Sequence, residues 1–209
     1  MRTKQDPIRI AVLISGGGTN LQALLDAQAT GALRSGRIAL VVADRTDAYG
    51  LVRAEKSGCK TRAVERKACT REEFEAALLE LLAQEEIELV ILAGFLQILS
   101  PAFVQAYPDR ILNVHPALIP SFCGEGYYGL RVHEAALARG VKVTGATVHI
   151  VNDVPDGGPI LLQKAVGVLE GDTPETLQKR VMEQAEWILL PQAAEQVAAQ
   201  MLEAKLKGK

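Results

Sequence analysis

Hydrophobic residues recur in short continuous runs through the first half of this chain, and segments with helical spacing separate them. Continuous rather than alternating apolar runs are typical of strands that helices cover on both faces of a sheet. The regular alternation of strands and helices predicts an α/β fold with a doubly wound, mostly parallel sheet. The predicted strands are Ile8–Ile14, Arg37–Ala43, Cys59–Val64, Ile87–Ala93 and Arg110–Val114.

Helices are predicted between these strands. They cover residues of about 19–30, 48–57 and 70–84, and a short one begins at Ser100. Thr70 with Glu73 three residues later has the spacing of a capping box, which fixes the start of the third helix.

The pattern changes after His115. Residues 116–129 are rich in proline, glycine and aromatic residues and are predicted to form a long loop, followed by a helix over Leu130–Arg139 that Gly140 ends. Val141–Val151 and Pro159–Val168 are predicted as two strands that extend the sheet in antiparallel fashion.

The C-terminal segment from Thr173 to about Leu206 is predicted to be helical, with Asp172 or Thr173 as its cap. Pro191 is expected to kink or split this helix, because proline cannot donate a backbone hydrogen bond. The apolar face is predicted to comprise Leu177, Val181, Ala185, Ile188 and Leu189.

Composition excludes several classes of protein. The chain has 209 residues, 48% of them hydrophobic and 23% charged, with a formal net charge of −2, which suits one globular domain and argues against a nucleic-acid or anionic-membrane partner. No apolar run approaches the roughly 20 residues of a membrane span, and the polar segment Met1–Arg9 is unlike a signal peptide. Cys59, Cys69 and Cys123 form no C-x-x-C pair, so we expect a cytoplasmic protein with reduced thiols.

A glycine loop, Ser15–Asn20, follows the first strand and opens the first helix. Glycines let a ligand approach the backbone, and the helix N-terminus offers free N–H groups, so a phosphate is the expected guest. Asp44 stands where a ribose-binding acid would stand in a dinucleotide site, but Leu21 occupies the third glycine position of that fingerprint. A phosphate monoester is therefore favoured, and a plain turn capped by Thr19 stays the alternative, with Asp44 as a turn residue.

Asn113 and His115 form the second candidate site. They are two residues apart at the end of a predicted strand, so both side chains leave the same face, and Pro116 then ends the strand. An amide that donates hydrogen bonds beside an imidazole that carries a proton suits a carbonyl oxygen that becomes charged during a reaction. The alternative is a strand end with a structurally satisfied histidine.

Four motifs occur in one order: the Ser15–Leu21 loop, Ala93–Pro101, Asn113–Pro116 and Asp156–Pro159. Together they resemble the phosphoribosylglycinamide formyltransferase family, and the resemblance runs from Ile8 to Pro191. It implies a Rossmann-like formyltransferase domain over 1–209, with a phosphate-binding half at about 8–100 and a catalytic, folate-binding half at about 101–191. It also implies transfer of a formyl group from 10-formyltetrahydrofolate, as cosubstrate, to glycinamide ribonucleotide in purine biosynthesis, without a metal.

The resemblance also assigns residues. The implied catalytic residues are Asn113, His115 and Asp156, and the carboxylate of Asp156 is expected to raise the pKa of His115. The implied nucleotide-binding residues are Gly18, Thr19, Asn20 and Glu186, with Glu183 as the alternative to Glu186. The implied folate contacts are Arg71, Leu96, Gln97, Ile98, Leu99, Asn113, Asn152, Asp153 and Asp156. Gln97 replaces an arginine that is frequent in the family, and the loop Cys123–Gly129 is a further departure.

Other interpretations stay open at this point. A 10-formyltetrahydrofolate hydrolase would use the same three residues with water, but it would need no phosphate loop. A non-catalytic nucleotide-binding module would not need the three residues together, and a Cys123–His115 nucleophile lacks an orienting third group. His133 is interpreted as a surface or packing residue. His149 either points toward the site or is a satisfied strand residue, and the second interpretation is favoured. A homodimer is left open.

Overall fold

One seven-stranded sheet organises the molecule, and the computed structural model describes it over residues 6–208. Residues 1–5 and 209 lie outside the described residues, so most of the expectation for Met1–Arg9 does too. The strand order is β3-β2-β1-β4-β5-β6-β7. The strands are β1 (Ile8–Ile14), β2 (Gly36–Ala43), β3 (Lys60–Ala63), β4 (Leu89–Leu92), β5 (Ile111–His115), β6 (Val143–Ile150) and β7 (Ile160–Gly167).

The pairing of the strands confirms the predicted fold class. All pairs among β1 to β5 are parallel, whereas β6 pairs with β5 and β7 in antiparallel fashion. The helices are α1 (Thr19–Thr30), α2 (Tyr49–Lys56), α3 (Arg71–Gln84), α4 (Pro101–Ala106), α5 (Leu130–Arg139), α6 (Pro174–Val181) and α7 (Trp187–Leu206). A short 3₁₀ helix (Arg66–Ala68) precedes α3, and a π-helical turn (Met182–Glu186) joins α6 to α7.

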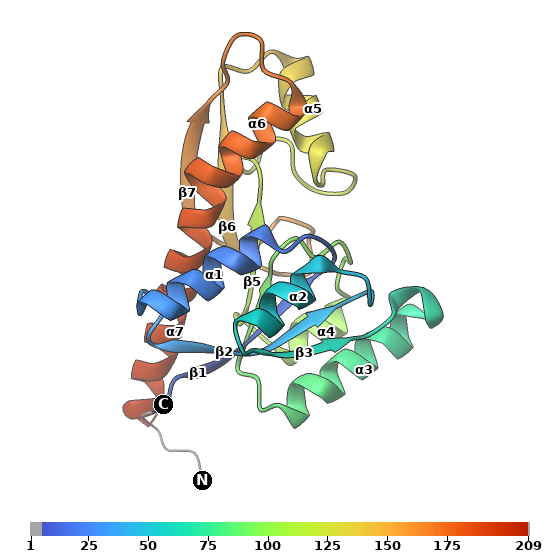
Figure 1. Cartoon of the computed structure of the whole chain (residues 1–209), viewed down its shortest axis with the longest axis vertical. Coiled ribbons are helices and arrows are strands. Elements are labelled where there is room, and N and C mark those ends of the chain that lie inside the picture. Colours follow the sequence, from blue (N-terminus) through green and yellow to red (C-terminus); the bar gives the residue numbers. More distant parts are fainter. Residues whose placement is uncertain (1–5, 209) are drawn as a thin grey trace.

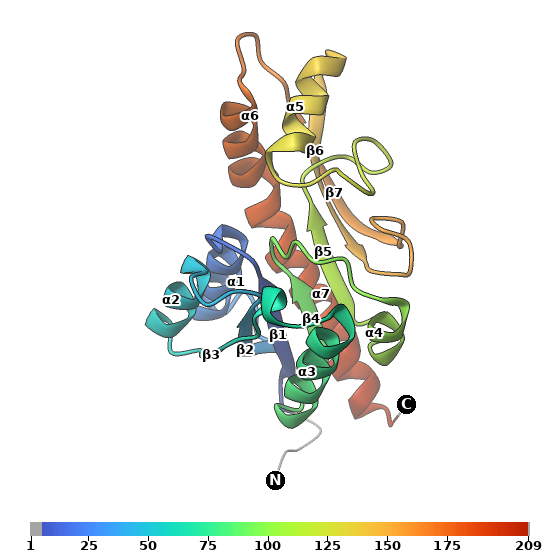
Figure 2. The same ribbon diagram turned by 90° about the vertical axis from the view of Figure 1, so that its right-hand side faces the viewer.

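Two buried clusters lie on the two faces of the sheet. Alternate residues of β1 explain the division: Ile10 and Val12 belong to the cluster that contains residues of α1, α2 and α7, whereas Ala11 and Leu13 pack with α3 and α4. Figures 1 and 2 show these helices covering opposite faces, with α5 and α6 beside the antiparallel extension. The central strands are therefore buried from both sides, as their continuous apolar runs predict, whereas the edge strands β3 and β7 are largely exposed.

Helix ends follow the sequence signals closely. Thr70 and Glu73 form the predicted capping box at the start of α3, and Ser100 caps α4 by accepting a hydrogen bond from the Phe103 N–H. Gly140 ends α5 in the left-handed conformation with φ 75°. None of the helices within residues 6–208 has the length and apolar character that a membrane span requires.

The C-terminal helical segment corrects two predictions. It is interrupted at the π-helical turn Met182–Glu186, before Pro191, and Pro191 itself lies inside α7 without splitting it. The wide turn also shifts the phase of the helix. Leu177, Val181, Ala185 and Leu189 are buried as predicted, but Ile188 is 38% exposed, so its assignment to the apolar face is wrong.

Candidate active site

A cavity of about 590 Å³ opens at the carboxyl ends of β1, β4 and β5. Its wall comprises the turn after β4, the end of β5, the loop that carries Tyr127 and Tyr128, the loop between β6 and β7, and the π-helical turn. In parallel sheets the carboxyl ends of strands meet at one edge, which is the usual place for a ligand. The cavity brings together segments that the sequence separates by up to about 170 residues, from Asn20 to Glu186.

Asn113 and His115 lie on β5 and line the cavity, as the strand periodicity predicts. Pairing of β5 with β6 places His149 opposite Asn113, and the Asn113 amide nitrogen lies 3.1 Å from His149 Nε2. His149 Nδ1 lies 3.0 Å from the carbonyl oxygen of Ile150, which can only accept, so Nε2 is left to accept from Asn113. His149 thus orients the amide and lines the cavity, so it faces the site, which the sequence left as the less favoured alternative.

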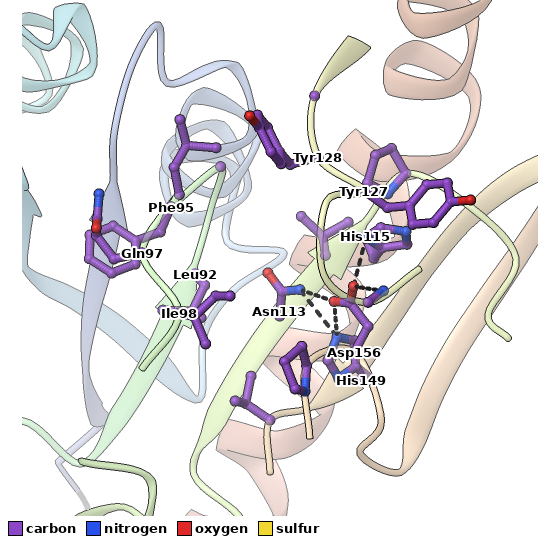
Figure 3. Close-up of a pocket in the computed structure, with 18 of the residues that line it drawn as sticks. Leu92, Phe95, Gln97, Ile98, Asn113, His115, Tyr127, Tyr128, His149 and Asp156 are labelled. Atoms are coloured by element: carbon purple, nitrogen blue, oxygen red, sulfur yellow. Dashed lines mark hydrogen bonds and ion pairs between the residues drawn. The ribbon is translucent and has the colours of Figure 1, made fainter. Parts of the chain in front are cut away.

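Asp156 completes the cluster from the loop between β6 and β7. Its Oδ1 lies 3.4 Å from the Asn113 amide nitrogen and 3.5 Å from His149 Nε2, and its Oδ2 lies 3.5 Å from His115 Nδ1. Figure 3 shows the four side chains converging from β5, β6 and this loop. The contacts are longer than the 2.7–2.9 Å of strong charge-assisted bonds, so the group is assembled but leaves room to tighten around a reacting atom.

The loop after Pro120 holds the two catalytic candidates directly. His115 Nε2 donates to the carbonyl of Phe122 at 2.8 Å, and the Gly124 N–H donates to Asp156 Oδ2 at 2.9 Å. Phe122 and Asp156 both have positive φ, 50° and 55°, a conformation that costs free energy for residues other than glycine. The strained backbone therefore sits where the loop meets the catalytic groups.

Electrostatics around His115 differ from the sequence-based expectation. Burial lowers the pKa of His115, and this effect outweighs the Asp156 carboxylate and the Phe122 carbonyl, which both raise it. The contribution of Asp156 has the expected direction, but burial makes the net change in the pKa of His115 a lowering. Burial alone would raise the pKa of Asp156, but the contact with His149, the charge of His115 and the Gly124 N–H bring it below its ordinary value.

The glycine loop has the geometry of an anion site. Gly18, not Thr19, is the N-cap of α1, and no side chain caps the helix, so its first N–H groups stay available. A Cβ atom on Gly16 or Gly17 would meet nothing within 4 Å, so their backbone faces open space. Gly18 is different, because its φ is 71° and a Cβ there would lie 2.7 Å from Gly50 Cα. Thr19 begins the helix, and its hydroxyl lies 3.8 Å from Met182 Sδ.

Asn20 and Glu186 meet beside this loop. The Asn20 amide donates to Glu186 Oε2 at 2.6 Å, and both side chains line the cavity. Burial raises the pKa of Glu186 to about 7, against the lowering effect of the Asn20 hydrogen bond. Glu183, the alternative, has a side chain that is 45% exposed and pairs with Lys179 at 3.5 Å, outside the cavity. The geometry therefore favours Glu186.

The predicted folate residues fall in three places. Leu96, Ile98 and Leu99 line the cavity from the turn after β4, and Leu96 and Ile98 are more than half exposed. Asn152 and Asp153 line it from the loop after β6. Arg71 stands behind the turn, where it donates to the Ile98 carbonyl at 2.9 Å.

A second cavity of about 290 Å³ lies on that far side of the turn. Arg66 and Arg71 line it together with Phe74 and Glu75. Gln97 borders both cavities, but its amide donates to Asp44 Oδ2 at 2.7 Å. Asp44 is 7% exposed and is not the simple turn residue that the sequence suggests, although Arg45 and Asp47 do pair at the surface.

The remaining candidates have weaker geometry. Cys123 Sγ lies 3.3 Å from the Pro120 carbonyl, and burial followed by the Asp156 charge raises the pKa of its thiol, so it is a poor nucleophile. His133 packs in the interior on α5. Burial and repulsion from His115 lower its pKa to about 4. Within residues 6–208 there is no cluster of three or more side chains with metal-ligand character.

Comparison with known proteins agrees with the geometry. Residues 8–193 match the family model described as formyl transferase. A protein of Escherichia coli (strain K12) named phosphoribosylglycinamide formyltransferase is 41% identical over 85% of this chain and 81% of its own length. The crystal structure of glycinamide ribonucleotide transformylase 1 from Symbiobacterium toebii has 46% identity and a TM-score of 0.87, covering 93% of this chain and 89% of that one.

Some relatives are much longer. The human trifunctional purine biosynthetic protein adenosine-3 is 43% identical over 96% of this chain, which spans only 19% of that protein. The match to the family model covers all seven strands and the helices as far as the start of α7, and it identifies the family. This chain belongs to the formyl transferase family and, within it, to the phosphoribosylglycinamide formyltransferases.

Proposed function

We propose that this protein transfers the formyl group of 10-formyltetrahydrofolate to the amine of N1-(5-phospho-D-ribosyl)glycinamide, in purine biosynthesis. One observation carries the proposal: a single cavity extends from Asn20, in the first turn of the uncapped helix α1, and the buried carboxylate of Glu186 to an apolar turn, with Asn113, His115 and Asp156 between them. This arrangement supports two different ligands that meet at one polar cluster.

The glycine loop and the end of the cavity beside it, at Asn20 and Glu186, suit a phosphorylated sugar. The free N–H groups at the start of α1 favour a phosphate, and the open space beside Gly16 and Gly17 leaves room for it. Glu186 is a hydrogen-bond acceptor within reach of the same loop through Asn20, which suits ribose hydroxyl groups. A formyl hydrolase that uses water would need neither feature.

The folate half suits a flat heterocycle with a charged tail. Leu96 and Ile98 offer exposed apolar surface to the ring, and Asn152 and Asp153 offer polar atoms at the opposite wall. Arg66 and Arg71 lie in the second cavity beyond the turn, where two guanidinium groups suit the carboxylates of a glutamate tail. Gln97 contributes no charge there.

The chemistry follows from the positions of the groups. The substrate amine forms a bond to the formyl carbon, and the carbonyl oxygen becomes an oxyanion that the Asn113 amide N–H can stabilise. The amine, now positively charged, loses a proton to Asp156, directly or through water, while His115 shares that proton across the 3.5 Å gap. The bond to the folate nitrogen then breaks, and the same proton goes to that nitrogen.

His115 gains its charge only during the reaction in this scheme. Burial lowers its pKa in the free site, so the ring is mainly neutral near pH 7, with Nε2–H on the Phe122 carbonyl and Nδ1 free to take a proton. The imidazolium then has an acceptor for each N–H, which are Phe122 and Asp156. No step needs a metal.

One assay tests the proposal. Purified protein is mixed with 10-formyltetrahydrofolate, and tetrahydrofolate release is followed with and without glycinamide ribonucleotide, together with detection of the formylated product. We expect release to depend on the nucleotide and to match product formation one to one. Equal release in water alone would favour the hydrolase, whereas binding of the nucleotide without any release would favour a non-catalytic module.

A further inference from the structure

The carboxylate of Asp44 joins the loops of the two proposed substrates. Its Oδ2 accepts one hydrogen bond from Ser15 Oγ at 2.9 Å and another from the Gln97 amide at 2.7 Å. Ser15 Oγ in turn accepts the Leu96 backbone N–H at 2.9 Å. Ser15 opens the glycine loop, whereas Leu96 and Gln97 belong to the turn after β4, so a closed set of bonds links the two.

Asp44 is buried, so loss of these hydrogen bonds would leave its carboxylate without partners at a cost in free energy. Asp44 directly follows β2 and is 7% exposed, and its Oδ1 has no hydrogen-bond partner among the described residues. A buried carboxylate costs free energy unless it is hydrogen-bonded, so Asp44 depends on its bonds to Ser15 and Gln97. Both of these bonds are made to the same oxygen, Oδ2. Motion of either donor therefore disturbs the other through a shared acceptor.

The backbone of Asp44 extends the connection. Its N–H donates to the carbonyl of Ile14, next to the glycine loop, at 3.3 Å, and its carbonyl accepts the N–H of Arg66 at 3.0 Å. Arg66 is one of the two arginines of the second cavity. Asp44, directly after β2, thus contacts the start of the glycine loop, the turn Leu96–Leu99 and the segment that contains Arg66.

We propose that Asp44 is a positioning residue that couples the glycine loop to the turn Leu96–Leu99, so that each substrate tightens the site of the other. The proposal rests on the function proposed above, because that function assigns one loop to the nucleotide and the turn to the folate. Gln97 acts through Asp44 and not as a folate ligand. Figure 3 shows it across the cavity from His115 and Asp156. Since coupling between two binding equilibria is reciprocal, it can be measured from either ligand.

The decisive experiment measures nucleotide affinity by calorimetry, in the absence and in the presence of saturating tetrahydrofolate. We expect tetrahydrofolate to tighten nucleotide binding by about fivefold or more in the wild type, the low end of usual coupling. Gln97→Leu removes the amide that binds Asp44, and it should bring this factor close to one, although Gln97 does not line the glycine loop. Gln84→Leu is the matched control, because the Gln84 amide also donates to a carboxylate, that of Glu80, but on the outer surface of α3.

A second pair of variants separates coupling from direct contact. If Gln97 acts through Asp44, then Asp44→Ala and the double variant should lose tetrahydrofolate affinity to the same extent. Additive losses with an unchanged coupling factor would mean that Gln97 contacts the folate itself, and the inference would fail. Thermal unfolding reports whether Asp44→Ala folds, and if it does not, Ser15→Ala breaks the same chain between Asp44 and Leu96.

Two further outcomes are informative. A wild-type coupling factor of one, with both ligands bound, would overturn this inference and leave the proposed function intact. Failure of the wild type to bind or formylate the nucleotide would instead remove the proposed function, whatever the variants do.

Discussion

Glu186→Gln is expected to stabilise the ligand-free protein while it weakens nucleotide binding. Burial raises the pKa of Glu186 from an ordinary 4.5 to about 7, which means that the fold disfavours the carboxylate. Glutamine has the same shape and stays neutral, and its amide can still accept the hydrogen bond from Asn20. It also offers a donor to the buried Asn20 Oδ1, which has no hydrogen-bond partner among the described residues.

The magnitude follows from the two pKa values. The gap between 4.5 and about 7, at ~1.4 kcal/mol for each pH unit, makes ionised Glu186 cost the fold about 3 kcal/mol. Below pH 4.5 the side chain is protonated in the folded and unfolded states, so no cost arises. Between pH 4.5 and 7 the unfolded state loses its proton first and wild-type stability falls, and above pH 7 the whole cost is present.

Chemical denaturation at a series of pH values tests this reasoning. The variant should match the wild type near pH 4.5 and exceed it by about 3 kcal/mol at pH 8, equivalent to roughly 6–12 °C in Tm for a chain of this size. Glu183→Gln is the control, because its exposed side chain lies on the same turn, and we expect a change within ~0.5 kcal/mol. A Glu186→Gln effect that is independent of pH would refute the argument. A ribonucleotide Kd unchanged by the variant would separately refute the binding role.

Three other substitutions test the catalytic cluster and the glycine loop. Asp156→Asn should lower kcat by ~10²–10⁴-fold with both ligands still bound, and imidazole NMR should show His115 titrating at lower pH; near-normal turnover would contradict the assignment. Cys123→Ser should keep most of the activity, since transfer is direct, and a loss as large as that of His115→Ala would disprove this. Gly17→Val should raise the nucleotide KM far more than the folate KM, because its side chain has space in the fold but enters the anion site; equal changes in both would argue against a phosphate loop.

The order of strands and helices could be predicted because each element is encoded locally. Continuous apolar runs mark β1, β2, β4 and β5, and Thr70 with Glu73 marks a helix start. The shared face of Asn113 and His115 follows from strand periodicity alone. The role of His149 could not be predicted in this way, because its contact with Asn113 depends on the antiparallel register of β5 and β6, which no local pattern specifies.

Contacts between distant loops account for the other differences. The bond between Gln97 and Asp44 spans 53 residues, and the one between His115 and the Phe122 carbonyl depends on a strained loop conformation. Likewise, the direction of the pKa change of His115 depends on how deeply the ring is buried, and the adjacent residues in the sequence do not determine that burial. Residues that act through partners far along the chain were therefore missed or misassigned.

The π-helical turn Met182–Glu186 has a consequence for how this segment can vary in length. A π turn holds one residue more than an α turn, so it behaves as an insertion that the helix has absorbed. Removing one residue from it would restore regular winding and keep the orientation of α7 relative to α6 nearly unchanged, because the π turn uses five residues for about the rotation that an α-helix completes with four. Winding the present residues as a regular α-helix would instead rotate everything downstream by about 100°, so that either α7 would lose its packing against α1 or Glu186 would leave the cavity. The π turn is therefore the place where this helical segment can lose a residue while α7 keeps its position.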